Sequence, residues 1–246
     1  MVSPIWQKEF FVEKWHAWLP AADEHIDNNL DTINISTDAP DFAFIPALTR
    51  RRLSFLTKIS LYVTDKCFGS QNTEKIQIIF ASQHGELQSS IKLLNSIASE
   101  ETLSPALFSL SVHNAAAGVF TILSKNTSPH CFVSAGEDTF LSSIMEAVGF
   151  LSEDKPIKVL LIIADDQVPA EYKRFYPDYR NSFAIGLFLN NFGVGAKYTI
   201  ERQNYSNETT QNNAKELISF LSESSEVKKC SFPKTSFVLK KGDKVE

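Results

Sequence analysis

One stretch of the chain decides the fold: Cys131-Phe-Val-Ser-Ala-Gly-Glu-Asp-Thr-Phe-Leu-Ser-Ser-Ile-Met-Glu-Ala147. Its first residues are apolar and β-forming, as in a short strand. Beyond position 138 the apolar residues recur at helical spacing. The two patterns meet at Gly136, whose backbone freedom suits a tight turn. We therefore predict a strand over 130–135, an elbow, and an amphipathic helix over 138–151.

Other strands and helices alternate on both sides of this stretch. The residue patterns predict strands over 10–18, 75–82 and 157–163, and helices over 48–66, 86–99 and 105–122. Such alternation is typical of an α/β fold in which helices cover both faces of a largely parallel sheet. We expect a mixed, mostly parallel five-stranded sheet covered by helices, closed by 182–189 and 196–202 as an antiparallel pair.

The domain organisation follows from the same pattern. We expect one domain over 1–202, followed by a C-terminal helix and tail over 203–246. The helix is predicted near 210–222, and the Lys- and Ser-rich tail after it has the composition of a frayed terminus. Neither an internal repeat nor a linker that would separate two large domains is visible in the sequence.

Composition narrows the class of protein. The 246 residues carry a net charge of −5, which argues against a nucleic-acid binder. Three widely spaced cysteines form no C-x-x-C pair, and no apolar run approaches the ~20 residues of a membrane span. We expect a cytoplasmic protein with reduced thiols. Nineteen Phe residues indicate a Phe-rich core or a contribution to an apolar tunnel or subunit interface.

Several blocks of sequence resemble a known family. They are Trp15-x-x-Trp18, Leu48-Thr-Arg-Arg-Arg-Leu-Ser-Phe-Leu, Phe80-Ala-Ser-Gln-His-Gly-Glu-Leu87, Leu103-Ser-Pro-Ala-Leu-Phe-Ser-Leu-Ser-Val-His-Asn-Ala-Ala-Ala-Gly-Val-Phe-Thr-Ile122, and the elbow at Gly136. In this order they resemble the short β-ketoacyl-synthase-like family, which corresponds to the N-terminal half of a ketosynthase. That family includes chain-length-factor subunits of aryl polyene biosynthesis. The resemblance implies a thiolase-like half-fold.

The resemblance also places Glu137 where a condensing enzyme carries its nucleophilic cysteine. A carboxylate cannot form the acyl thioester that a thiolate forms at such an elbow. All five histidines precede Glu137, whereas the catalytic histidines of elongating ketosynthases follow the cysteine. The resemblance therefore implies a non-catalytic subunit that heterodimerises with a full-length ketosynthase and meets an acyl carrier protein transiently. For Glu137 itself we expect a structural role, with Asp138, in capping the helix and favouring its dipole, or a direct role in the partner's reaction.

The resemblance further implies a subunit interface and an acyl tunnel. The loop and helix around 105–122 would face the partner through Phe108, Ser111, His113, Asn114, Ala117 and Gly118. The alternative is a helix buried within its own domain. Our candidates for the wall of the acyl or polyene tunnel are Phe108, Phe120 and Phe140. Such a wall would limit product length by steric overlap with one more extension unit.

Three consecutive arginines, Arg50, Arg51 and Arg52, open the helix expected over 48–66. They could attract the acidic surface of an acyl carrier protein or pair with carboxylates at the subunit interface. Because consecutive residues point in different directions around a helix, one shared role is not expected.

Other functions remain as alternatives. A carrier-protein docking scaffold would use the arginines without shaping a tunnel, and a homodimeric binding protein would need no ketosynthase. An independent hydrolase would use Ser82, His84 or Ser134, although a triad rarely comes from one short segment. We expect no cofactor, because the sequence has neither a cluster with metal-ligand spacing nor a Gly-rich phosphate loop.

Overall fold

The longest strand, β1 (Trp6–Trp18), joins the two halves of one β-sheet. The computed structural model describes residues 6–20, 34–68, 76–175, 181–203, 214–222, 227–232 and 235–244. Within them the strands lie in the order β4-β3-β5-β6-β1-β7-β9-β8, with β2 beside β1. Their bounds are β2 (Ile35–Ser36), β3 (Gln77–Ala81), β4 (His130–Val133), β5 (Lys158–Asp165), β6 (Phe183–Asn190), β7 (Ala196–Gln203), β8 (Val227–Phe232) and β9 (Thr235–Lys244).

The sheet is mixed, but the expected five strands and mostly parallel direction are wrong. The described residues form nine strands. Strand β3 pairs in parallel with β4 and β5, and β2 pairs in parallel with β1, whereas the other strand pairs are antiparallel. Strands β8 and β9 pair with each other, and β9 pairs with β7, where we expected a frayed tail. Strand β2 is a further short strand that the sequence did not predict.

The expected pairing of 182–189 with 196–202 is also wrong, because β1 lies between β6 and β7. Residues 11–18 of β1 pair with β6, and residues 6–12 pair with β7. The chain therefore crosses β1 between the two strands, near the irregularity in β1 between Val12 and Lys14. Gly195 lies at this crossing with φ +101°, and a Cβ there would lie 2.2 Å from the carbonyl oxygen of Val12. Only glycine allows this close an approach.

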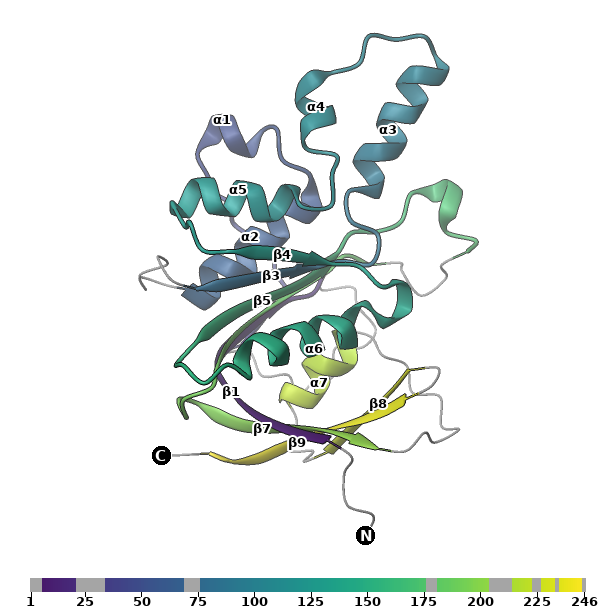
Figure 1. The fold of residues 1–246 in the computed structure, drawn as a ribbon. Helices are drawn as coiled ribbons and strands as arrows, with labels where there is room; N and C mark the ends of the chain where they lie inside the picture. The colour runs from purple at the N-terminus through teal and green to yellow at the C-terminus, as the bar shows by residue number, and fades with distance from the viewer. Residues whose placement is uncertain are drawn as a thin grey trace.

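Helices cover both faces of the sheet, as expected for an α/β thiolase-like fold (Figure 1). Helices α2 (Phe55–Phe68) and α5 (Ala115–Ser124) cover one face, and α6 (Thr139–Leu151) and α7 (Ala214–Ser222) cover the other. Alternate residues of β3 and β5 enter the two cores: Ile78 and Leu160 face α2 and α5, whereas Ile79 and Leu161 face α6. These strands are apolar throughout because both faces are buried.

Two expected helices are each interrupted. The first becomes α1 (Ala47–Arg50) and α2, and the second becomes α4 (Pro105–Ser109) and α5. Serine side chains begin the new helices: Ser54 Oγ accepts from Thr57 N at 3.0 Å, and Ser104 Oγ accepts from Leu107 N at 3.3 Å. With α3 (Leu87–Ala98), helix α4 stands beyond β4 in Figure 1. The short 3₁₀ helices are η1 (Gly136–Asp138) and η2 (Ala170–Tyr172).

The described residues after position 203 pack on the same sheet. From α7, Leu217, Ile218, Phe220 and Leu221 enter the core beneath α6, and Phe237 and Leu239 of β9 join them. In the described parts of the chain, the helices are too short or too polar to cross a membrane.

The crossing over β1 gives a test of the topology. We expect Gly195→Ala to lower the free energy of unfolding by about 3 kcal/mol or more, because a left-handed φ and a collision with backbone act together. Gly193→Ala is the matched control, since its φ is +92° but no atom lies within 4 Å of the added Cβ. It should cost about 1 kcal/mol through strain alone. Equal urea-unfolding midpoints for the two variants would contradict the close crossing.

Candidate functional site

The elbow between β4 and α6 forms as the sequence predicts. Gly136 has φ +60°, and η1 continues directly into α6. The Thr139 hydroxyl accepts a hydrogen bond from Ala135 N at 2.9 Å and donates one to Gly136 O at 2.6 Å. Ile144 and Ala147, further along α6, are buried against the sheet. The backbone of the elbow is therefore fixed by Thr139 and by the packing of α6.

Glu137 is exposed at this elbow. Asp138, the N-cap residue of α6, makes no side-chain capping hydrogen bond, so its expected capping role is wrong. The Thr139 hydroxyl instead accepts a hydrogen bond from the backbone N–H of Ala135 in the elbow. Partial burial, and secondarily the charge of Glu137, raises the pKa of Asp138. The position that the resemblance assigns to a nucleophile thus presents a solvated carboxylate at the carboxyl end of β4.

A buried carboxylate, that of Asp165, organises the carboxyl ends of β3 and β5. Asp165, at the end of β5, accepts hydrogen bonds from Ser82 Oγ at 2.6 Å, His84 N at 3.0 Å and Gln83 N at 3.1 Å. Ser82 Oγ in turn accepts from Gly85 N at 2.8 Å. Burial raises the pKa of Asp165 to about 6, against the opposing effect of these hydrogen bonds. Asp165 thereby fixes the loop over residues 82–86.

Glu86 holds the other end of the same loop. It is 4 % exposed and accepts hydrogen bonds from Ser54 Oγ at 2.5 Å, Thr57 Oγ1 at 2.9 Å and Ser89 Oγ at 2.8 Å. These hydroxyls come from the first residues of α2 and α3. The carboxylate therefore joins two helix N-termini, where a negative charge is favourable.

His113 lies over this loop beside the edge strand. Its imidazole is 5.2 Å from the ring of Phe132 in β4, with the planes 40° apart. A Cβ on Gly85 would lie 2.1 Å from His113 Cδ2. Burial, and secondarily the neighbouring His113, lowers the pKa of His84. The loop, the segment before α5 and β4 thus meet at one place.

The hydrogen bonds described for Ser82 and Ser134 do not pair a nucleophilic hydroxyl with a base. Ser82 is 2 % exposed and donates to a carboxylate rather than to an imidazole. Ser134 donates to the carbonyl oxygen of Gln83 at 3.2 Å. A hydrolase needs a hydroxyl that is accessible and paired with a base, so the geometry disfavours that alternative. Among the described residues, three or more His, Cys, Asp or Glu side chains do not gather as metal ligands.

The predicted interface residues fall into two groups. Phe108, His113 and Asn114 are exposed, and Ser111 and Gly118 are half-buried. Ala117 is fully buried in the core beneath α5, so its predicted place at an interface is wrong. Residues 115–117 and 119–120 form the inner face of α5, and this leaves the outer face and the segment before the helix for contact.

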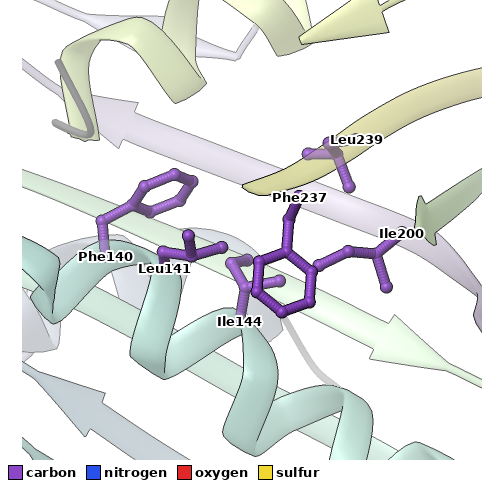
Figure 2. Close-up of a pocket in the computed structure, with 6 residues that line it drawn as sticks. All are labelled: Phe140, Leu141, Ile144, Ile200, Phe237 and Leu239. Carbon is purple, nitrogen blue, oxygen red and sulfur yellow. The ribbon is translucent and has the colours of Figure 1, made fainter. Parts of the chain in front are cut away.

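The three predicted tunnel residues lie in different surroundings. Phe108 is 65 % exposed. Phe120 is packed between Phe68 and Phe80, at ring-centroid distances of 5.6 and 6.4 Å, so it fills the core and does not line an open passage. Phe140 lines a small apolar cavity between α6, β7 and β9 (Figure 2). That cavity measures about 10 Å³, the space of one water molecule. It is too small for an acyl chain.

The three arginines do not lie along one helix. Arg50 ends α1 and donates to the carbonyl oxygen of Phe42 at 3.0 Å. Arg51 and Arg52 are exposed in the turn that separates α1 from α2. Arg50 therefore has a structural contact, and Arg51 and Arg52 remain accessible to a partner.

Sequence reasoning missed the roles of Asp165 and of Gly85. A signal for Asp165 was present, because two acidic residues follow the apolar run of β5 at the carboxyl edge of parallel strands, where functional groups gather. The contact between Gly85 and His113 joins residues 28 positions apart, and spacing does not reveal it.

Asp165 makes stability depend on pH. Its folded pKa of about 6 lies above the ordinary value of 3.8, so the folded chain holds this proton more tightly than the unfolded chain. The contribution is present below pH 4 and is lost as pH rises to 6. Relative to Asp165→Asn, we expect the free energy of unfolding of the wild type to fall by about 3 kcal/mol from pH 4 to 7.

Urea unfolding at several pH values measures this difference. Ser82→Ala provides a second variant, because removal of a hydrogen bond to the ionised carboxylate should extend the fall to higher pH. Parallel pH profiles for the wild type and Asp165→Asn would show that Asp165 is not the titrating group.

Proteins of similar fold are found among solved structures. Among curated proteins, none matches the sequence. A solved ketosynthase (ApeO) in complex with its chain length factor (ApeC) from Xenorhabdus doucetiae is similar, with a TM-score of 0.75 and 22 % identity over 95 % of this chain and 99 % of that chain. The ishigamide ketosynthase/chain length factor gives a TM-score of 0.61 and 13 % identity, covering 80 % of this chain and 68 % of that one.

A third similar structure is AntDE:AntF, a type II polyketide synthase acyl-carrier protein in complex with its ketosynthase. Its TM-score is 0.60 at 11 % identity, over 81 % of this chain and 70 % of that chain. At these identities the likeness concerns the fold, which is thiolase-like. Residues 15–243 match the family described as β-ketoacyl synthase, N-terminal domain. The match spans most of the sequence, and the chain therefore belongs to the β-ketoacyl synthase N-terminal-domain family.

Proposed function

We propose that this chain is a non-catalytic, chain-length-factor-like subunit that heterodimerises with a full-length β-ketoacyl synthase. The observation that carries the proposal is Glu137, an exposed carboxylate on the elbow, at the position that the resemblance assigns to the nucleophile. The backbone of the elbow is held in place by the hydrogen bonds of Thr139 and by α6. Its chemistry is altered, since a carboxylate does not form the acyl thioester.

The free edge of the sheet supports association with another chain. In the described residues, β4 ends the strand order and pairs only with β3. An unpaired edge presents N–H and C=O groups that can pair with a second chain. Exposed apolar side chains lie on α1, α4, the segment before α5, and α5: Leu48 is 76 % exposed, Phe108 65 %, Val112 49 % and Ile122 78 %. Large exposed apolar side chains are typical of interaction surfaces when they gather in one region.

In this proposal, Phe108 is the residue that would control product length. Of the three aromatic candidates it is the one that is accessible in the isolated chain. Phe120 and Phe140 lie within the chain's own cores, so their influence on a partner would be indirect, through the packing of α5 and α6. A bulky side chain presented across the interface would set product length by excluding a further extension unit.

A carrier-protein docking scaffold is the second candidate. Arg51 and Arg52 are accessible in the turn after α1, and exposed basic side chains attract an acidic carrier protein. This role needs no contribution to the acyl tunnel. The two proposals therefore differ in whether a change at Phe108 alters the product or only its amount. Both leave the chain without a nucleophile of its own.

Co-expression with the ketosynthase encoded nearest to this chain tests the assignment. We expect a stable one-to-one complex in size-exclusion chromatography with mass detection. Condensation should be lost when the partner's catalytic cysteine is replaced, and should be retained with Glu137→Ala, because Glu137 supplies no reacting group. A chain that associates with no ketosynthase, or loss of condensation in Glu137→Ala with the complex intact, would contradict the proposal.

The second test compares two exposed phenylalanines. In the reconstituted complex, Phe108→Ala should shift the product distribution towards longer chains, because the steric limit is removed. Phe192→Ala is the matched control, since Phe192 is 42 % exposed in the loop between β6 and β7. This loop follows Asn190, which pairs with Lys158 at the amino end of β5, away from the carboxyl ends of β3, β4 and β5. Mass spectrometry of the released products measures the shift. A change in yield without a change in length would favour the docking scaffold.

A further inference from the structure

The loop over residues 82–86 is tied to the elements around it more tightly than a connecting loop requires. Asp165 holds its beginning, and Glu86 holds its end against α2 and α3. Ser134, in the segment after β4, donates to the carbonyl oxygen of Gln83. Two carboxylates are buried to achieve this, and burial of an ionisable group is costly unless hydrogen bonds compensate. A rigid loop is therefore maintained at the carboxyl end of β3.

Gly85 is the point at which this rigid loop supports His113. The glycine has φ +53°, and a Cβ on it would lie 2.1 to 2.8 Å from three atoms of the His113 ring. Real Cβ atoms do not approach other atoms so closely, so the imidazole rests directly on the glycine backbone. The centroid of the same ring lies 5.2 Å from that of Phe132. His113 therefore packs against both the loop at Gly85 and the edge strand at Phe132.

The supported imidazole is accessible and lies beside the edge strand of the sheet. His113 is exposed, and β4, which carries Phe132, has no strand beyond it among the described residues. We propose that Gly85 is a positioning residue for the heterodimer: lacking a Cβ, it seats His113 against Phe132, and His113 in this seat contacts the ketosynthase subunit.

The position of His113 beside the edge strand and the chemistry of its imidazole both suit contact with a ketosynthase subunit. A strand that pairs with β4 would bring its side chains about 5 Å from those of β4, and hence next to Phe132 and His113. An imidazole can both donate and accept a hydrogen bond while its ring packs on an aromatic neighbour. This inference rests on the proposed pairing with a ketosynthase, and it adds the residue that sets the geometry of the contact.

A double-mutant cycle tests the inference on the full chain, with the ketosynthase encoded nearest to it. The dissociation constant is measured for the wild type, Gly85→Ala, His113→Ala and the double variant. We expect each single variant to weaken binding about tenfold and the double variant to bind no more weakly than His113→Ala, because Gly85 acts through His113. Gly193→Ala, which shares a positive φ without a neighbour, should leave binding unchanged.

A second readout separates positioning from loss of stability. The imidazole resonances of His113 should shift in Gly85→Ala and stay in place in Gly193→Ala. Strictly additive effects, or unchanged binding by His113→Ala in a complex that forms normally, would overturn the inference and leave the heterodimer proposal standing. If the wild type binds no ketosynthase, both fall. If it forms a homodimer that His113→Ala weakens, the occupant is a second copy of this chain and the assignment to a ketosynthase is wrong.

Discussion

The structure depends on the burial of both faces of β3, β5 and β6. Their side chains alternate between two apolar cores, so helices must cover the sheet on both sides. Polar groups are consequently confined to the strand ends. Asp165, the 82–86 loop and the elbow at Gly136 all lie at the carboxyl ends of the parallel strands. With both faces covered, an edge strand such as β4 is where a second chain can extend the sheet.

The buried carboxylates show how that end of the sheet is made rigid. Asp165 and Glu86 each accept three hydrogen bonds, and the donors are hydroxyl and backbone N–H groups from separate elements. A charged acceptor forms stronger hydrogen bonds than a neutral one. It also carries a desolvation cost, which appears here as the raised pKa of Asp165. The arrangement therefore gives a fixed loop geometry at some expense in stability near neutral pH.

Much of this architecture could be predicted from the sequence, for identifiable reasons. The elbow and its helix followed from local pattern, because Gly136 separates a β-forming run from a helical one. Burial of Ile144 and Ala147 agrees with that pattern. The order of strands was less accessible, since β1 pairs on both sides and the crossing at Gly195 depends on contact with Val12. Local pattern contains no information about which strand lies between two others.

The candidate site, like the fold, could be predicted from the sequence in part. Its position at Glu137 followed from family resemblance, whereas the burial of Ala117 depends on which face of α5 meets the core. One continuous helix was expected over 105–122, whereas the structure divides it into α4 and α5. The turn over 110–114 interrupts the expected helix, and Phe108 before this turn and His113 within it are accessible.

The chemical state of the nucleophiles agrees with a subunit that supplies shape. Burial raises the pKa of Cys67 to about 12, and burial with the nearby Glu146 raises that of Cys131 to about 11, so both thiols stay protonated at neutral pH. The Ser82 hydroxyl is committed to Asp165, and burial with nearby lysines lowers the pKa of His16 to about 4. These groups are held by packing and hydrogen bonds in unreactive forms. Accessible apolar side chains lie elsewhere, among them Phe108 and Val112, and the proposed contact with a partner would use these.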